Sequence, residues 1–252
     1  MRSAIRNAAA LAAAATLIAA AAASGAVTGG TTPAPPPVKA IAEAPTPRVS
    51  WTARVIRPTD VRAAPRRGAR RLAPLSPYAP YDQGPQSLLV LESRASPAEG
   101  VWYRVLLPTR PNTASGWVSS SAVRVASTPW RVRVSLGARR TELLRAGHVV
   151  ASWTSAIGTP ANPTPTGRFA ISEVVPQAEP GGFFGTVILT LTAHSPRLSE
   201  FEGGDGRVAL HGTNLPQLLG QAVSHGCIRL PNAAARRLGA VLPPGAPVDV
   251  VS

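Results

Sequence analysis

Residues 224–230 read Ser-His-Gly-Cys-Ile-Arg-Leu, and residues 211–213 upstream of them read His-Gly-Thr. Cys227 is the only cysteine of the 252-residue chain, and it follows His225 by two positions. The thiolate form of cysteine attacks carbonyl carbons, and a nearby imidazole can take the thiol proton and lower the apparent pKa of the thiol. We therefore expect Cys227 to be a nucleophile and His211 to be its base.

The backbone around these two motifs also favours acyl chemistry. Gly226 predicts a sharp turn and lets the chain come close to a bound carbonyl group. The N–H groups of Gly226 and Cys227 are candidates for an oxyanion hole. Residues 207–210 read as a short strand, and His211 projects from its end. Because Asp205 is the only acidic residue near either motif, we expect a backbone carbonyl to orient the base.

Two alternative roles compete for the same residues. Free cysteines are commonly buried, so Cys227 is a structural core residue in the first alternative. In the second, His211, His225 and Cys227 are zinc ligands, because imidazole and thiolate groups both bind zinc. The spacing lacks the paired cysteines of familiar zinc sites, and the sequence offers no clear fourth ligand. We therefore expect no metal at this site.

Outward from the motifs, residues 130–252 alternate short strands with turns. The 27 prolines and 22 glycines of the chain favour short strands over long helices. The β-prone runs are 130–136, 139–144, 149–150 and 186–192. Residues 232–242 predict the one clear helix, with Asn232 as its cap and Pro243 as its stop. The fold class expected is mostly β, with one or two short helices.

A second β unit is expected between residues 51 and 126. Short β-branched and aromatic runs separated by turn residues are typical of a small all-β domain. Residues 27–50 are rich in Pro, Ala and Thr, which predicts a flexible or extended linker. The predicted architecture is two small β domains in series.

The N-terminus carries the pattern of a secretory signal. Arg2 and Arg6 precede the uncharged run 8–23, and small residues end the segment at Ala26. We expect residues 1–26 to be a cleaved signal peptide and the protein to act in the cell wall or periplasmic space. The apolar run, about 16 residues, is just shorter than the roughly 17–25 of a spanning helix. Retention of the signal as a membrane tether is the alternative.

The charge balance predicts a polyanionic neighbour. The chain has 26 basic and 12 acidic residues, a formal net charge of +14. An anionic wall polymer fits this balance, whereas an arginine-rich coding bias would explain it without any partner. Nucleic-acid binding favours basic residues interleaved with aromatics on one surface, which this sequence lacks. With the export signal, that excludes nucleic acid from the expected partners.

The motif at 224–230, together with His-Gly-Thr at 211–213, resembles the signature of the YkuD-type L,D-transpeptidases. The segments 158–160 and 164–169 resemble that family's substrate-side loop, and the resemblance covers about residues 130–251. More loosely, residues 51–126 resemble a bacterial SH3-like domain, with Trp-Tyr-Arg-Val in its centre and Gly-Trp-Val near its end.

The resemblance implies a β-sandwich catalytic domain that cross-links peptidoglycan, preceded by an SH3-like β-barrel. Its substrate would be a tetrapeptide stem, from which the enzyme releases the terminal D-alanine through a cysteine thioacyl intermediate. A neighbouring stem would then resolve the intermediate to a 3→3 cross-link. The resemblance implies no cofactor, and it makes carbapenem-type β-lactams expected inhibitors.

The family's site residues carry over onto matching positions of this sequence. Cys227 would be the nucleophile, and His211 the general base and later the general acid. His225 and Gly226 would shape the oxyanion site, and Ser224 would brace the turn. The remaining residues implied at the substrate are Gly212, Thr213 and Arg229. The Gly212 carbonyl would also hold the imidazole. Arg229 would contact a substrate carboxylate or hold the loop.

Three functional alternatives stay open on the sequence. The same chemistry with water as acceptor would make the protein an L,D-carboxypeptidase. With a protein amine as acceptor it would attach proteins to the wall. A non-catalytic wall-binding protein is the rival from another class, and the presence of both Cys227 and His211 argues against it.

Overall fold

The computed structural model describes residues 46–200 and 203–252. All of these residues belong to one compact unit. The predicted signal peptide, residues 1–26, and most of the predicted linker, residues 27–50, lie outside the described residues. Among the described residues, no helix is long and apolar enough to cross a membrane.

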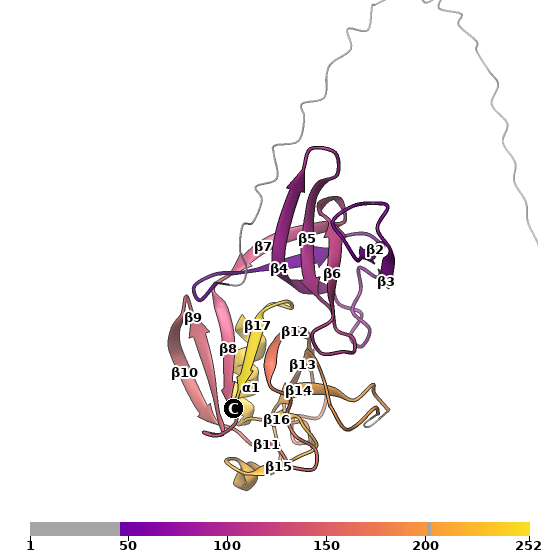
Figure 1. The fold of residues 1–252 in the computed structure, drawn as a ribbon. Coiled ribbons are helices and arrows are strands. Elements are labelled where there is room, and N and C mark those ends of the chain that lie inside the picture. Colours follow the sequence, from indigo (N-terminus) through magenta and orange to yellow (C-terminus); the bar gives the residue numbers. More distant parts are fainter. Residues whose placement is uncertain (1–45, 201–202) are drawn as a thin grey trace, which may run out of the picture. The chain divides into compact units, whose positions relative to one another are not determined.

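The first part of the described chain forms one seven-stranded sheet in which all neighbouring strands are antiparallel (Figure 1). Its strand order is β3-β2-β6-β5-β4-β1-β7. The elements are β1 (Ser50–Val55), β2 (Thr59–Arg62), β3 (Arg71–Leu75), β4 (Ser87–Ser96), β5 (Gly100–Leu106), β6 (Ser115–Ser119), the 3-10 helix η1 (Ser120–Ala122) and β7 (Val123–Thr128).

The second part contains an eight-stranded mixed sheet and a two-stranded one. The large sheet has the order β10-β9-β8-β17-β12-β13-β14-β16, and the small one pairs β11 with β15. The elements are β8 (Trp130–Ser135), β9 (Arg140–Arg145), β10 (His148–Thr154), β11 (Ile157–Gly158), β12 (Gly167–Pro176), β13 (Val187–His194), β14 (Arg207–His211), the 3-10 helix η2 (Pro216–Leu218), β15 (Ala222–Ser224), β16 (Ile228–Arg229), α1 (Asn232–Val241) and β17 (Pro247–Val251).

Alternating and continuous apolar runs explain these strands. In β13, the side chains at Val187, Leu189 and Leu191 are buried on one face, which is the period of a strand. The two parts each enclose an apolar core, and a smaller cluster of Leu89, Leu106 and Ala170 joins β4 and β5 to β12. The predicted fold class, mostly β, is confirmed. The SH3-like assignment of residues 51–126 stays a prediction.

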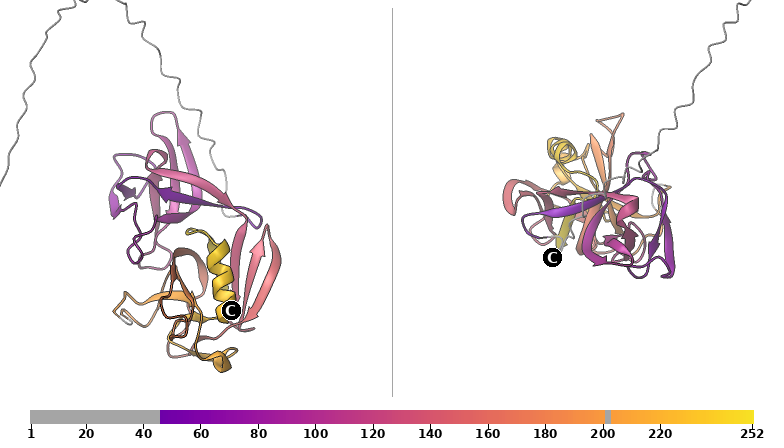
Figure 2. Two further views of the ribbon diagram at one scale, coloured as in Figure 1. Left: turned by 180° about the vertical axis from the view of Figure 1, so that it is seen from behind. Right: turned by 90° about the horizontal axis from the view of Figure 1, so that it is seen from above.

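Helix α1 lies within one residue of its predicted range and packs on the large sheet (Figure 2). Ala234, Ala235 and Leu238 form its buried face and belong to the core cluster of the sheet. The predicted cap was wrong, because Pro231 occupies the N-cap position and Asn232 is already helical. The side chain of Asn232 instead reaches a loop beside the predicted base.

Candidate active site

Two neighbouring strands bring the sequence motifs together. Strands β14 and β16 pair in parallel, with His211 opposite Arg229. The Leu230 N–H also donates to the His211 carbonyl at 2.8 Å. Cys227 directly precedes β16, so the imidazole and the thiol reach the same end of the sheet. One small cavity is lined by five of the predicted residues, His211, Ser224, His225, Cys227 and Arg229.

The turn that carries Cys227 is held by its own side chains. Ser224 Oγ donates to the Cys227 carbonyl at 2.6 Å and accepts the Gly226 N–H at 3.1 Å. Gly226 has φ +122°, a conformation that L side chains rarely adopt, so the predicted sharp turn requires glycine. Thr164, from the predicted substrate-side loop, donates its hydroxyl to the Gly226 carbonyl at 2.9 Å. The thiol therefore stands on a braced loop.

One of the two expected oxyanion-hole donors, the Gly226 N–H, already donates a hydrogen bond to Ser224 Oγ. A donor already used within the turn does not serve a substrate oxygen unless that hydrogen bond opens. The Cys227 N–H has no hydrogen-bond partner among the residues that the structure describes. Of the two predicted donors, Cys227 is the one free to stabilise an oxyanion.

The ring of His211 is fixed by a backbone carbonyl, as the shortage of nearby acids led us to expect. His211 is buried, and its Nδ1 lies 2.6 Å from the Gly212 carbonyl oxygen. A carbonyl only accepts, so Nδ1 carries the hydrogen. In the neutral ring, Nε2 is then an acceptor, which is the form that a general base requires.

Burial is the largest cause of the pKa shift of both candidate groups, His211 and Cys227. Burial lowers the pKa of His211 to about 4; the Gly212 hydrogen bond opposes this shift and the charge of Arg229 adds to it. Burial raises the pKa of the Cys227 thiol, against the effects of the Ala209 backbone and the charge of Arg229. The net effect is a thiol pKa above its ordinary value. The resting pair at neutral pH is a thiol beside a neutral imidazole.

Two aromatic residues cover the imidazole of His211. Phe183 and Phe184 stand in the connection between β12 and β13, with ring centroids 6.1 and 5.1 Å from that of His211. The guanidinium of Arg229 lies 4.9 Å from the centroid of the Phe183 ring. The glycine-rich segment 181–185, which carries both rings, is the tip of the β12–β13 hairpin and covers the imidazole.

Cys227 also borders a second and larger cavity. This cavity has a volume of about 440 Å³, whereas the one beside His211 has only about 10 Å³. Protein ligand sites typically measure about 300–1,000 Å³, and roughly 10–15 Å³ holds one water. Phe184 lines both cavities and Tyr81, from the first β unit, lines the larger one. The larger cavity therefore offers room for a ligand beside Cys227.

Hydrogen bonds hold Tyr81 in that cavity wall. The N–H groups of Tyr81 and Asp82 both donate to Oε2 of the buried Glu173, at 3.0 and 2.9 Å. The Tyr81 hydroxyl donates to Asp205 at 3.0 Å, and the Arg207 guanidinium lies 5.4 Å from the ring centroid. These partners are more than 90 positions away in sequence, so no local pattern marks Tyr81 as a site residue.

Gly212 and Thr213 line neither of these cavities. The Thr213 N–H donates to Asn232 Oδ1 at 3.0 Å, and Asn232 Nδ2 donates to the Thr213 carbonyl at 3.1 Å. A Cβ on Gly212 would collide with the same Asn232 Oδ1. The segment after His211 is thus clamped to the start of α1.

In the described part of the chain, no group of three or more His, Cys, Asp or Glu is placed to hold a metal ion.

Comparison with known proteins identifies the domain that carries this site. The L,D-transpeptidase catalytic domain model, YkuD, matches residues 129–250. A relative named as a YkuD L,D-transpeptidase, from Bacillus licheniformis, is 32% identical over 154 residues, which cover 58% of this chain and 85% of the relative. The chain belongs to the YkuD L,D-transpeptidase family.

A second YkuD relative, from Bacillus subtilis, is 30% identical over 151 residues, with 58% of this chain and 84% of the relative covered. Among solved structures, the L,D-transpeptidase LdtMt1 in complex with imipenem matches with a TM-score of 0.42 and 16% identity, over 82% of this chain and all of the other. The family predicted from residues 224–230 is confirmed. The family model does not extend over residues 51–126.

Proposed function

We propose that this YkuD protein is a peptidoglycan L,D-transpeptidase that forms 3→3 cross-links through a thioacyl enzyme at Cys227. The observation that carries the proposal is the thiol and the buried imidazole of His211 on one cavity, with Nδ1 of the ring held by the Gly212 carbonyl. That arrangement leaves Nε2 to act on the thiol proton.

In the first half-reaction, Cys227 Sγ attacks the carbonyl carbon of the third stem residue while His211 Nε2 accepts the thiol proton. The C–N bond to the terminal D-alanine breaks, and the imidazolium returns that proton to the leaving amine. The product is a thioester on Cys227. The developing oxyanion faces the Cys227 N–H, with the positive charge of Arg229 nearby.

In the second half-reaction, an amine of a neighbouring stem attacks the thioester and gives its proton to His211. The C–S bond breaks, an amide forms, and the thiol of Cys227 recovers its proton. Because Phe183 and Phe184 cover the imidazole, they limit the access of water to it. Exclusion of water favours transfer to an amine over hydrolysis, and so favours the transpeptidase over the carboxypeptidase.

The larger cavity beside Cys227 is the proposed place of the donor stem. Its lining is mostly apolar, and Arg207 with Asp205 supplies charged groups at its wall. The carboxylate of the terminal D-alanine suits the guanidinium of Arg207. Arg229 is mostly buried under Phe183 and shares the other cavity, so its proposed role is to set the charge around the base rather than to bind a remote carboxylate.

Export is part of the proposal, because peptidoglycan lies outside the cytoplasmic membrane. The signal-like pattern of residues 1–26 supports it. Carbapenem-type β-lactams are proposed as acylating inhibitors, since their strained carbonyl is open to the same thiol. Intact mass measured after incubation with imipenem should rise by one drug adduct in the wild type and not in Cys227→Ala. An unchanged wild-type mass would count against this inhibitor class.

The direct test is product analysis after incubation of the full chain with a disaccharide tetrapeptide. Wild type should give cross-linked dimers with release of D-alanine, and Cys227→Ala and His211→Gln should give neither. His148→Gln is the matched control, because His148 is exposed on β10. Trimmed tripeptide without dimers would make the protein an L,D-carboxypeptidase. A folded wild type with no product would favour the wall-binding alternative.

A further inference from the structure

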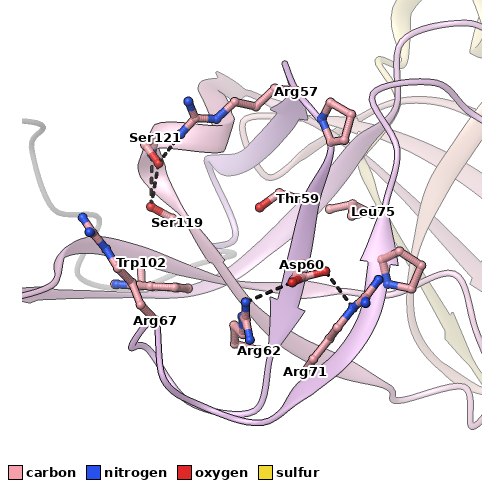
Figure 3. Close-up of a pocket in the computed structure, with 12 residues that line it drawn as sticks. Arg57, Thr59, Asp60, Arg62, Arg67, Arg71, Leu75, Trp102, Ser119 and Ser121 are labelled. Carbon is pink, nitrogen blue, oxygen red and sulfur yellow. Dashed lines mark hydrogen bonds and ion pairs between the residues drawn. The ribbon is translucent and has the colours of Figure 1, made fainter.

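The first β unit contains a cavity of about 720 Å³ that plays no part in the reaction at Cys227. Strands β2 and β3, the start of β5 and the segment around η1 supply its lining (Figure 3). Its volume lies in the range of ligand sites in proteins, about 300–1,000 Å³. It is larger than the cavity proposed for the peptide stem, so it can hold several units of a polymer.

Four arginines line this cavity against a single acid. Asp60 lies between two of them, with Arg62 Nη2 at 2.9 Å from Oδ2 and Arg71 Nε at 2.7 Å from Oδ1 (Figure 3). One carboxylate cancels one positive charge, so even this trio carries a net charge of +1. The trio also fixes the two guanidinium groups in place, which reduces the entropy that a ligand would have to remove.

The guanidinium groups of the other two arginines, Arg57 and Arg67, have no carboxylate partner in the described ranges 46–200 and 203–252. Arg57 donates to the hydroxyl of Ser121 at 2.7 Å (Figure 3), which leaves its charge uncompensated. Arg67 makes no ion pair among the residues that the structure describes; only its backbone N–H contacts Glu99, at 3.0 Å. The cavity lining therefore holds four positive charges and one negative charge, an excess of +3 that the neighbouring Glu99 reduces to +2.

The remaining lining is suited to a hydroxylated chain. The hydroxyl groups of Thr59, Ser119 and Ser121 face the same cavity as the arginines, and Trp102 supplies part of the wall (Figure 3). Hydroxyls both donate and accept, whereas guanidinium groups only donate. A ligand with oxyanions spaced along a backbone of hydroxyl-bearing units would satisfy both kinds of group.

We propose that this cavity binds an anionic polymer with repeating oxyanions on a hydroxylated backbone. Guanidinium groups bind phosphate and carboxylate alike, so phosphodiester and carboxylate polymers are two sources of the same chemistry. The site would hold the enzyme on such a polymer while the other domain reacts with peptide stems. Binding at this cavity does not depend on the reaction at Cys227. A result that overturns the proposed binding site therefore leaves the proposed function intact, and the reverse also holds.

The test is calorimetric titration of the full chain carrying Cys227→Ala, which removes any turnover. The probes are polyglycerol phosphate, polygalacturonate and uncharged dextran. We expect at least one anionic polymer to bind, with an affinity that falls as salt rises, and dextran not to bind. The anionic polymer that binds more tightly identifies the source. Dextran binding as tightly as both, or no binding of either anionic polymer, would overturn the proposal.

A pair of double variants separates this site from diffuse surface charge. Arg57→Gln with Arg67→Gln removes two charges of the cavity but leaves the Asp60 trio intact, and it should weaken binding at least tenfold. Arg54→Gln with Arg124→Gln is the matched control, because both side chains are exposed and they face each other on β1 and β7, outside the cavity. Equal weakening by the two double variants, or none by the first, would contradict a built site.

Discussion

The buried imidazole of His211 makes the stability of the chain depend on pH. Burial lowers its pKa from 6.5 to about 4. Between these pH values the His211 imidazole is protonated in the unfolded chain and neutral in the folded chain. The stabilising effect is fully present above pH 6.5, is lost as pH falls, and is gone below about pH 4. A shift of about 2.5 units corresponds to about 3 kcal/mol of unfolding free energy.

The measurement is urea unfolding between pH 7 and pH 4, followed by tryptophan fluorescence, for the wild type and His211→Gln. Other groups titrate in both proteins, among them His194, whose pKa burial also lowers, so only the difference between the two profiles reports on His211. The wild type should lose about 3 kcal/mol more than the variant over this range. The exposed His148→Gln should follow the wild type. Parallel profiles for wild type and His211→Gln would refute the assignment of a buried neutral base.

Three further predictions test the surroundings of the site. Gly212→Ala should lower thermal stability and cross-linking activity, because the added Cβ collides with the side chain of Asn232. The double variant with Asn232→Ala should recover part of both. No recovery would exclude that collision as the cause. Tyr81→Ala should raise the KM for the donor stem several-fold, with a smaller change in kcat, because Tyr81 lines the larger cavity. Tyr81→Phe keeps the ring and should stay near wild type. Wild-type kinetics for Tyr81→Ala would contradict a contact between Tyr81 and the stem. Iodoacetamide alkylation of Cys227 should keep accelerating up to and beyond pH 9, since burial raises the pKa of the thiol, and a plateau near pH 7 would contradict that direction.

The sequence predicts the strands and the reactive pair because both depend on local patterns. A run such as 186–192 is β-branched and apolar enough to form a strand in any mostly-β context, and the structure places β13 there. The motif at 224–230 contains its own turn, with Ser224 and Gly226 within three positions of Cys227. Such short-range geometry can be read before the fold is known.

The parts that were missed depend on contacts between distant segments. Asparagine is a residue type that commonly caps helices, which is why the sequence favoured Asn232 as the N-cap. Its side chain instead binds Thr213, 19 positions away, and this tertiary contact outweighs the local preference for capping. Tyr81 reaches Glu173 over 92 positions. The raised pKa of the Cys227 thiol follows from the segments that pack around it, which a motif does not encode. Pairing, burial and domain contacts all require the fold.

The central claim is that Cys227 forms a thioester with the third residue of a peptide stem. Intact mass of the full chain, recorded within the first turnovers on a disaccharide tetrapeptide and followed by peptide mapping, tests it most directly. We expect an adduct equal to the stem without its terminal D-alanine, located on Cys227 and absent from Cys227→Ala. A wild type that makes cross-linked product while the adduct lies on another residue, or forms equally in Cys227→Ala, would contradict the claim.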